Sequence, residues 1–325
     1  MRGHSSSNRN SASLPLALLL AMLVLLSAAI ANAQKASWTN GAPMPTSRSE
    51  IAAAELDGLI YVAGGLGRFG TLDAFEVYDP VKNSWRELAA LPEGRHHLAL
   101  AAHDGKVYLT GGYADLTFTP NRKTGWSYDP KKNEWQPVAD MPGPRAAHRM
   151  AAVGGKLYVA GGVGPDPLAV WAYDPSKNSW EAELEPLPTA REHLAIVGAA
   201  GKLYVIAGRW GNQNLRVVEA YDPASNSWSR LADLPAERGA LTASVITGRI
   251  HVTGGEDLNS AATYGEHWVY DPSSDQWEVA PAMPTSRHGL ASSAAGGKWY
   301  VIGGGTGAGF RTFFTLSDAV EIYQP

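Results

Sequence analysis

Short apolar runs occur in pairs along most of the chain, and a two-residue turn separates the members of each pair. The clearest copy reads Ala151 to Val153, Gly154-Gly155, then Lys156 to Ala160. The second turn residue is always Gly, at Asp57-Gly58, Asp104-Gly105, Gly154-Gly155, Ala200-Gly201, Thr247-Gly248 and Gly296-Gly297. Two-residue hairpin turns of this kind need positive φ, which costs Gly little. The pattern predicts six antiparallel hairpins.

Each hairpin belongs to a longer repeat of four short strands, a to d. An Arg stands 16 residues before a small-residue pair in all six copies, at Arg48, Arg95, Arg145, Arg191, Arg238 and Arg287. A third run ends in Tyr-Asp-Pro in five copies, and a Trp follows seven residues after each Tyr, at Trp85, Trp135, Trp180, Trp228 and Trp277. Asp-Pro followed by Asn or Asp is typical of a turn, so the Trp lies in a fourth strand.

The two ends of the chain predict how the repeats are arranged. One four-stranded sheet cannot bury both faces, so the repeat indicates a solenoid or a propeller. The last unit stops at Tyr323 before its fourth strand, whereas Trp38 lies in a strand d without its own a, b and c. We expect an all-β, six-bladed propeller whose last blade the N-terminal strand completes. The expected blades cover residues 47–92, 93–142, 143–188, 189–235, 236–284, and 285–325 together with 36–45.

Composition adds limits to this picture. The chain has 325 residues, of which 45% are hydrophobic and 18% charged, so it can bury the core of a single domain over residues 34–325. Its net charge of −4 gives no reason to expect a nucleic acid or an anionic membrane as a partner. It contains no Cys, which excludes structural disulfides.

Residues 1–33 have the pattern of a signal peptide. Arg2 and Arg9 lie in a polar head, residues 14–30 are uncharged and apolar, and Ala31-Asn32-Ala33 is a small-residue cleavage site. We expect cleavage after Ala33, a secreted or periplasmic protein, and no membrane span afterwards. The alternative is an uncleaved anchor, although 17 apolar residues are barely long enough to span a bilayer.

The repeat resembles that of kelch proteins, which carry Arg near strand a, Gly-Gly after strand b, Tyr before the c–d turn and Trp in strand d. The resemblance covers residues 34–325 and implies a six-bladed propeller that binds ligands at one face of its central channel. Kelch sub-families include protein-binding adaptors, exported sialic-acid mutarotases and copper-radical sugar oxidases similar to the central domain of galactose oxidase. The oxidase is excluded, because its radical Tyr is crosslinked to a Cys and this chain has none.

The b–c loops hold nearly all of the length variation between the repeats, and they emerge on the same face as the arginines. Variable loops on a constant scaffold are typical positions of function. The six repeat arginines either form an anion-binding ring at this face or pair within the blades as part of the repeat. Arg209, Trp210, Phe310 and Arg311 are the predicted ligand-binding residues of the loops. The longest loop, Gly305 to Phe314, is either a lid over the channel or a Gly-rich tip.

Several titratable residues follow the arginines closely and are expected to border the channel, namely Glu50, His96, His97, His148, Glu192, His193 and His288. If the protein is an enzyme, Glu192, His193 and His97 are the candidates for proton transfer on a bound sugar. A zinc site is not expected, because the histidines come from four separate blades, form no i, i+2 pair and have no Cys beside them as a further ligand. We therefore predict no metal and no cofactor.

The sequence thus predicts an exported, monomeric binding module that recognises a protein, a peptide or a carbohydrate, anionic in character, at an Arg-rich channel face. The alternative is a mutarotase or epimerase that acts on an acidic sugar such as sialic acid. A purely structural envelope protein with an idle channel face is the third possibility.

Overall fold

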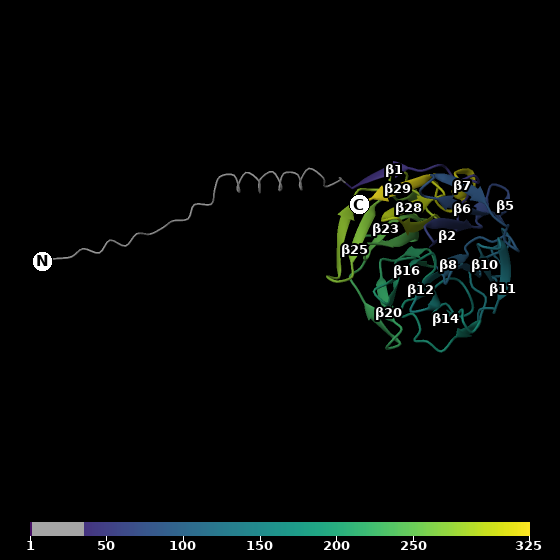
Figure 1. The fold of residues 1–325 in the computed structure, drawn as a ribbon, viewed down its shortest axis with the longest axis horizontal. Helices are drawn as coiled ribbons and strands as arrows, with labels where there is room; N and C mark the ends of the chain where they lie inside the picture. Colours follow the sequence, from purple (N-terminus) through teal and green to yellow (C-terminus); the bar gives the residue numbers. More distant parts are fainter. Residues whose placement is uncertain (2–35) are drawn as a thin grey trace. The chain divides into compact units, whose positions relative to one another are not determined.

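Six four-stranded antiparallel sheets arranged in a ring make up the fold, as the sequence predicts (Figure 1). The computed structural model describes Met1 and residues 36–325, and the predicted signal peptide lies outside them except for Met1. Ser37–Gln324 form one compact unit. Within the described part of the chain, no helix has the length and apolar character needed to cross a membrane.

Each blade follows the order a-b-c-d from the channel outward. Blade 1 contains β2 (Ala52–Leu56), β3 (Leu59–Ala63), β6 (Phe75–Asp79) and β7 (Ser84–Glu87). Blade 2 contains β8 (Ala99–His103), β9 (Lys106–Thr110), β10 (Gly125–Asp129) and β11 (Glu134–Val138). Blade 3 contains β12 (Arg149–Val153), β13 (Lys156–Ala160), β14 (Trp171–Asp174) and β15 (Ser179–Glu181). In Figure 1 the first strands β2, β8 and β12 lie nearer the middle than β11 or β14.

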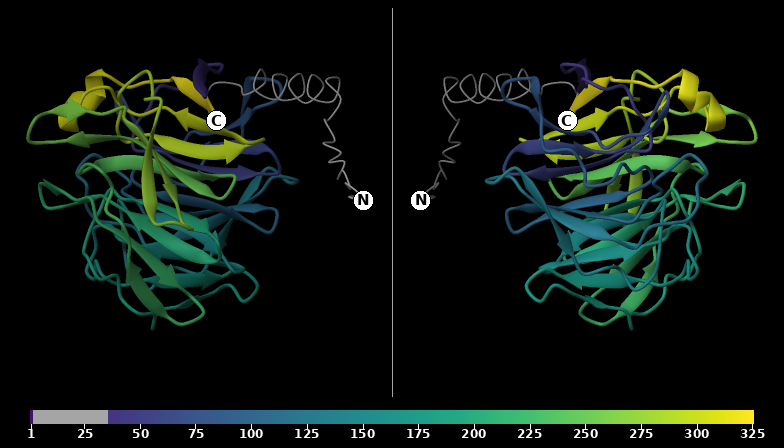
Figure 2. Two further views of the ribbon diagram at one scale, coloured as in Figure 1. Left: turned by 90° about the vertical axis from the view of Figure 1, so that its left-hand side faces the viewer. Right: turned by 90° about the vertical axis from the view of Figure 1, so that its right-hand side faces the viewer.

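The second half of the chain repeats this arrangement. Blade 4 contains β16 (Ala195–Ala199), β17 (Lys202–Ile206), β20 (Val218–Asp222) and β21 (Ser227–Arg230). Blade 5 contains β22 (Gly239–Ile246), β23 (Arg249–Asp257), β25 (His267–Asp271) and β26 (Gln276–Ala280). Blade 6 contains β27 (Ala291–Ala295), β28 (Lys298–Ile302), β29 (Val320–Gln324) and β1 (Ser37–Asn40). Figure 2 shows the blades from two sides.

The b–c loops add short elements on one face of the ring. Two of the loops form small hairpins, β4 (Leu66–Gly67) with β5 (Gly70–Thr71), and β18 (Arg209–Trp210) with β19 (Gln213–Asn214). The strand β24 (Ala262–Thr263) pairs with β23, and the last loop contains the 3₁₀ helix η1 (Gly309–Phe314).

The N-terminal strand closes the ring. β1 pairs antiparallel with β29, and Trp38 lies opposite Tyr323. The indole N–H of Trp38 also donates to the carbonyl of Pro281 in blade 5, at 2.7 Å. The sheet edge of blade 6 is therefore covered by the other end of the chain, as expected from the missing fourth strand.

The Tyr and Trp of the repeat join neighbouring blades to each other. The Tyr78 hydroxyl donates to Asn83 Oδ1, which also accepts from the backbone N–H of Ala42 in the preceding connection. The Trp85 indole N–H donates back to the Ala42 carbonyl at 2.9 Å. The equivalent Trp contacts recur at Trp135, Trp180, Trp228 and Trp277. The fixed offset between Tyr and Trp therefore reflects one contact between blades that is repeated around the ring.

The repeat arginines are scaffold residues, and this corrects the expectation of an Arg-rich face. Arg95, Arg145, Arg191 and Arg287 each donate to the carbonyl of the residue 16 positions later. That residue is the first of the small pair, so the hydrogen bond explains the constant spacing. Five of the six arginines have an exposed fraction of 0% or 1%, namely Arg48, Arg95, Arg145, Arg191 and Arg287, and Arg238 has 5%. Their guanidinium groups lie inside the blades.

Buried acids complete three of these arginine sites. Arg48 pairs with Glu76 at 2.5 Å, Arg287 pairs with Glu321 at 2.8 Å, and Arg191 pairs with Glu219. Arg145 instead donates from its two terminal nitrogens to backbone carbonyls and stacks on Trp171, whose ring centroid is 3.9 Å from its Cζ. Burial lowers the pKa of Arg145 to about 10, so it stays charged at neutral pH.

A ring of backbone hydrogen bonds surrounds the channel. The residue two positions after each repeat arginine donates its N–H to the carbonyl of the equivalent residue in the neighbouring blade, at 2.6 to 3.1 Å. The six members are Glu50, His97, Ala147, His193, Ala240 and Gly289. The N–H of Glu50 donates to the carbonyl of Gly289, and this bond closes the ring. All six have φ between 52° and 57°, in the left-handed region. The strand a predicted to begin at the Arg begins four residues later, beyond this ring, in five blades, whereas in blade 5 it begins at Gly239 and includes the ring residue Ala240.

Candidate functional site

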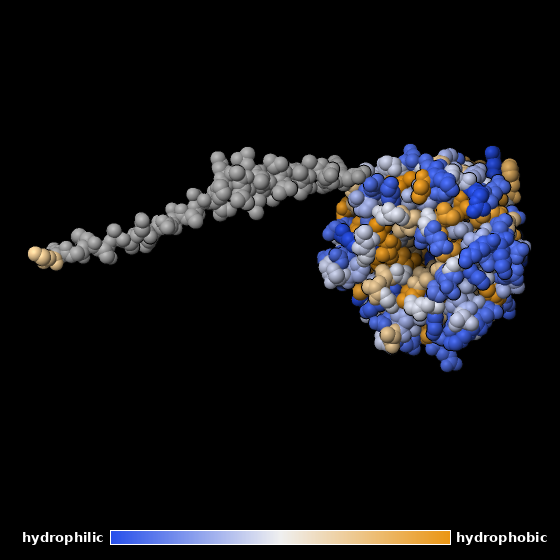
Figure 3. Space-filling model, viewed as in Figure 1, coloured by the Kyte–Doolittle hydropathy of each residue, from blue (hydrophilic) through white to orange (hydrophobic). Residues whose placement is uncertain are grey.

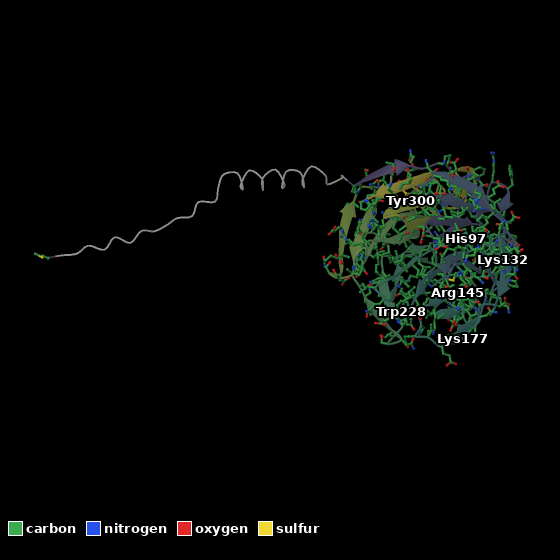
Figure 4. All side chains as sticks on the ribbon, in the orientation of Figure 1. His97, Lys132, Arg145, Lys177, Trp228 and Tyr300 are labelled. Carbon is green, nitrogen blue, oxygen red and sulfur yellow. The ribbon has the colours of Figure 1, made fainter. Side chains whose placement is uncertain are left out.

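The side chains of the ring converge on a pocket of 480 Å³ at the channel mouth on the b–c loop face. Glu50, His97 and His193 line its floor together with His288, Arg209 and Glu256. Leu66, Phe118, Leu258, Phe310 and Phe313 are among the residues of its walls. The face drawn in Figure 3 is hollowed near its middle, with hydrophobic residues around the hollow. His97 lies nearer the middle of the ring than Lys132 or Lys177 (Figure 4).

Glu50 is at the centre of the floor. Its carboxylate lies 3.3 Å from His97 Nε2, 3.8 Å from His193 Nε2 and 3.7 Å from His288 Nδ1. Burial raises the pKa of Glu50, and nearby Glu256 raises it further, while His288 opposes the shift. Gly289 makes room for this side chain, because a Cβ there would lie 2.5 Å from Glu50 Oε1.

An arginine and two acids form the second part of the floor. Arg209 donates to Glu192 at 2.8 Å and to Glu256 at 2.5 Å. Glu256 also accepts the backbone N–H of Gly309 at 2.7 Å, which ties the last b–c loop to the floor. Glu192 contacts His193 Nδ1 as well as Arg209. The charge of Arg209 is therefore shared between two carboxylates, which weakens its attraction for an anion.

His97 and His193, two of the three histidines of the floor, are held in the neutral form. Burial lowers the pKa of His97 and of His193 well below the usual value, and neighbouring positive groups lower both further. Behind His97, burial lowers the pKa of His96 to about 4. Both floor imidazoles therefore present a lone pair at neutral pH.

The last b–c loop lies over the pocket. Phe310, Arg311, Thr312 and Phe313 from η1 line the pocket, and the Thr312 hydroxyl donates to Ser49 Oγ at 3.1 Å in the neighbouring blade. Phe310 has an exposed fraction of 81%. Of the two possibilities left open for residues 305–314, the structure shows a folded loop over the channel mouth.

The structure brings together only some of the predicted site residues. His97, His193, Arg209, Phe310 and Arg311 line the pocket, and Glu192 lies directly behind it. Trp210 is in β18, is 45% exposed and does not line the pocket. His148 is fully buried and bonds to Thr110, so it belongs to a blade and not to the channel mouth. The six repeat arginines do not line the pocket either.

Glu256 lines the pocket but was not among the residues predicted from the sequence, although the sequence holds a signal for it. Glu256 directly follows the small pair Gly254-Gly255, and Arg209 directly follows Ala207-Gly208. In both blades this residue forms a bridge with the residue after the repeat arginine, so it lies at the mouth of the channel. The residue directly after the small-residue pair therefore predicts the lining of the pocket as well as the residues directly after the repeat arginine do.

Comparison with known proteins identifies the family. The model of the KLHDC2/KLHL20/DRC7 Kelch-repeats domain matches residues 21–162 and 147–321, which is most of the chain. The protein belongs to the kelch-repeat family, whose propellers generally mediate protein interactions.

Curated relatives share part of this repeat. Over 73 residues the chain is 38% identical to Kelch-like protein 33 of Homo sapiens, covering 22% of this chain and 14% of that protein. Over 80 residues it is 34% identical to the Influenza virus NS1A-binding protein homolog of Mus musculus, covering 25% and 12%. An F-box/kelch-repeat protein of Arabidopsis thaliana is 38% identical over 93 residues, covering 26% and 25%. The chain thus spans a quarter or less of the length of these relatives.

Among solved structures, that of YjhT has a TM-score of 0.73 to this protein at 19% identity, covering 87% of this chain and 99% of that one. At this identity the likeness concerns the fold alone. It supports the six-bladed kelch propeller and leaves the ligand to be inferred from the site.

Proposed function

We propose that the b–c loop face binds a protein segment that places a basic or hydroxyl-bearing group in the pocket and apolar side chains around it. The observation that carries the proposal is the position of the exposed large hydrophobic residues. Within the described residues, seven of them lie in b–c loops of this face, namely Phe69, Leu116, Val163, Leu168, Trp210, Phe310 and Phe314. Apolar residues gathered on one face around a polar pocket are typical of a protein-binding site.

The charge of the floor determines the chemistry of the inserted group. Glu50 and Glu256 line the pocket, Glu192 lies behind it, and Arg209 is already paired with two of these acids. Arg311 at the rim is the other cationic residue of the lining. A ligand carboxylate would therefore meet more negative than positive charge. The pocket favours a basic or neutral group, which revises the anionic ligand expected from the repeat arginines.

The experiment is a selection of peptides from a random display library on the purified protein, followed by affinity measurements on synthetic copies. Phe310→Ser and Trp210→Ser remove exposed aromatic side chains of the b–c loops and are called the rim variants. Val279→Ser changes a residue of β26 that is 85% exposed and lies outside these loops. We expect the rim variants to weaken binding at least tenfold, because aromatic side chains that a partner covers dominate the affinity of such interfaces. Val279→Ser is the matched control. If the rim variants bind as the wild type does, this face is not the docking site.

A carbohydrate is the second candidate ligand, and the pocket itself favours it. Phe118 and Phe313 offer apolar surface to the C–H face of a sugar ring, while the floor offers acceptors to its hydroxyl groups. A thermal-shift screen of neutral and amino sugars tests this ligand class, with sialic acid as the acidic comparison. Anomer exchange followed by NMR then separates a binder from a mutarotase, since a binder leaves the exchange rate at its buffer value.

We also propose that the protein is exported and acts as a monomer. Export is supported by the polar head, the apolar run and the Ala31-Asn32-Ala33 site of the first 33 residues. The absence of Cys suits a fold whose ring closure, through β1 and β29, does not need a disulfide. Intact-mass analysis of the protein from culture supernatant and periplasm tests export, with Gln34 as the expected first residue. Light scattering tests the monomer.

A further inference from the structure

Glu50 differs from the other buried glutamates of the propeller. Among the described residues, each other buried glutamate pairs with an arginine, namely Glu76, Glu192, Glu219, Glu256 and Glu321. Glu50 is 5% exposed, and within salt-bridge distance it has only imidazoles, those of His97, His193 and His288. A buried carboxylate without a cation is costly. Arg149 and Arg209 act on Glu50 only from beyond salt-bridge distance, so the position has room for a positive charge in direct contact with the carboxylate.

The hydrogen bonds behind His97 fix the direction of its lone pair. The carbonyl of Asp115 only accepts, so His96 Nε2 donates to it at 2.9 Å and His96 Nδ1 is left as an acceptor. His97 Nδ1, 2.5 Å away, then donates to His96 Nδ1. The proton of neutral His97 is thereby placed on Nδ1, and the lone pair of Nε2 points at Glu50 Oε2, 3.3 Å away. The His97 lone pair and the Glu50 carboxylate therefore face each other, and a proton or a metal cation between them would satisfy both.

His193 is arranged in the same way from the opposite side of the ring. Its Nδ1 contacts the Glu192 carboxylate, which is also held by Arg209. The Glu192 carboxylate is the acceptor beside Nδ1, and Nε2 lies 3.8 Å from Glu50 Oε2. Histidines that bind metals usually donate their second nitrogen to a carboxylate or another acceptor, which fixes the tautomer and the ring orientation. His97 has such a partner in His96, and for His193 the neighbouring Glu192 carboxylate offers one.

We propose that Glu50, His97 and His193 bind one divalent transition-metal ion at the floor of the pocket. Their candidate ligand atoms lie within 4.8 Å of one another. Ligands at about 2.0 to 2.2 Å from a tetrahedral Zn²⁺ are separated by roughly 3.4 Å, so small side-chain movements close the site. Two imidazoles and one carboxylate suit Zn²⁺, Fe²⁺ or a similar ion better than Mg²⁺ or Ca²⁺.

The prediction of no metal rested on these histidines coming from separate blades. The backbone ring removes that reason, because it carries the ring positions of blades 1, 2 and 4 to the same channel mouth. The remaining coordination positions of the ion face the pocket, where a ligand group or water completes the shell. His288 donates from Nε2 to the carbonyl of Gly307 at 2.9 Å, and its Nδ1 makes no hydrogen bond. This Nδ1 lies 3.1 Å from Glu256 Oε2 and 3.7 Å from Glu50 Oε1, so it is near enough to become a fourth ligand.

The test is a calorimetric titration of the metal-depleted, full-length protein with Zn²⁺, without a histidine tag and without peptide or sugar. We expect one ion per chain and at least a tenfold loss of affinity in Glu50→Gln and in His193→Gln. His103→Gln removes a histidine of β8 that does not line the pocket and is expected to bind as the wild type does. No saturable binding, or equal binding by all variants, overturns the proposal.

A second measurement covers the case in which a variant fails to fold. X-ray absorption of the Zn²⁺ complex of the wild type is expected to show two imidazoles and oxygen ligands, and a first shell without imidazole overturns the site. The inference does not depend on the proposed protein ligand. Peptide binding measured with EDTA and with Zn²⁺ shows separately whether the docking face and the metal site exist.

Discussion

Arg287 donates to the carbonyl of Gly303, 16 residues later, at 2.7 Å, and Arg95, Arg145 and Arg191 make the equivalent bond. The same guanidinium holds Glu321 in strand β29 at 2.8 Å. One side chain therefore joins the channel connection, the end of strand b and strand c within a blade. The arginine is constant because three parts of the blade depend on it.

Replacing one of these arginines is expected to destabilise the protein strongly. Arg287→Met leaves the Glu321 carboxylate buried without its cation and with only the Thr285 hydroxyl as a side-chain donor, since the side chains of Arg287 and Glu321 are 0% and 3% exposed. The loss of unfolding free energy is about 3 to 5 kcal/mol for a broken buried pair. Chemical denaturation measures it. The double variant Arg287→Met/Glu321→Gln is expected to regain part of the loss, and Arg311→Met on the exposed loop is the neutral control.

The N-terminal strand is expected to be required for a closed, soluble ring. A chain that begins at Gly41 lacks β1 and leaves β29 as an exposed edge, whereas a chain that begins at Ala36 keeps the pairing. Exposed edges template association between chains. We expect the shorter chain to melt at a lower temperature and to form higher-order species in size-exclusion chromatography. Equal melting of the two chains would contradict closure by β1.

Stability is expected to fall with acid because histidines are buried in neutral form. Burial lowers the pKa of His251 to about 3 and that of His267 to about 4, from an unfolded value near 6.5. The unfolded chain therefore binds protons first as the pH falls. Their contribution to stability is fully present above about pH 6.5 and is lost progressively from there toward pH 4.

The pair His251→Phe/His267→Phe tests this pH dependence. Both imidazoles lie within a cluster that includes Trp299 and Tyr323, with His251 Nδ1 2.9 Å from His267 Nε2. Melting temperatures measured between pH 7 and pH 4 are expected to fall less steeply in the double variant than in the wild type. An unchanged slope would assign the acid sensitivity to the other buried histidines.

Gly289 is expected to protect the position of Glu50. Gly289 and Gly211 have similar φ, 57° and 60°, so an Ala at either site pays about 1 to 2 kcal/mol for the left-handed conformation. A Cβ at Gly289 meets Glu50, whereas a Cβ at Gly211 has no atom within 4 Å. Gly289→Ala is therefore expected to lower the melting temperature more than Gly211→Ala. Equal shifts would show that Glu50 moves aside at no cost.

The fold was predictable because its signals are local. The hairpin turn Asp57-Gly58 has φ of 52° and 80°, as the sequence indicated, and Trp38 completes the last blade. The direction of the arginine side chains was not predictable, because a constant residue at the edge of a strand is compatible with a channel ligand or with a blade contact. The burial of the arginine and its hydrogen bond to the carbonyl 16 residues later show that it makes a blade contact. Both are properties of the tertiary structure and cannot be read from the local sequence.

The site was predictable only in part. Glu50 and His193 were expected near the channel, because each follows a repeat arginine by two residues. Glu50 and His193 lie close together because of the backbone ring, which joins residues as distant in the sequence as 50 and 289. A short stretch of sequence therefore cannot predict their contact. The residues that vary between repeats within a constant frame turned out to be the ones that line the pocket.

The backbone ring has a consequence for how such a pocket can change. Its hydrogen bonds use only main-chain atoms, and its requirement is a left-handed φ and not a particular side chain. The present set is Glu, His, Ala, His, Ala and Gly, of which Ala147 and Ala240 carry a single methyl group. Ala147 and Ala240 are thus attachment points at which single substitutions can bring new chemistry to the channel mouth without a change in the blades, whereas Gly289 is restricted by its contact with Glu50.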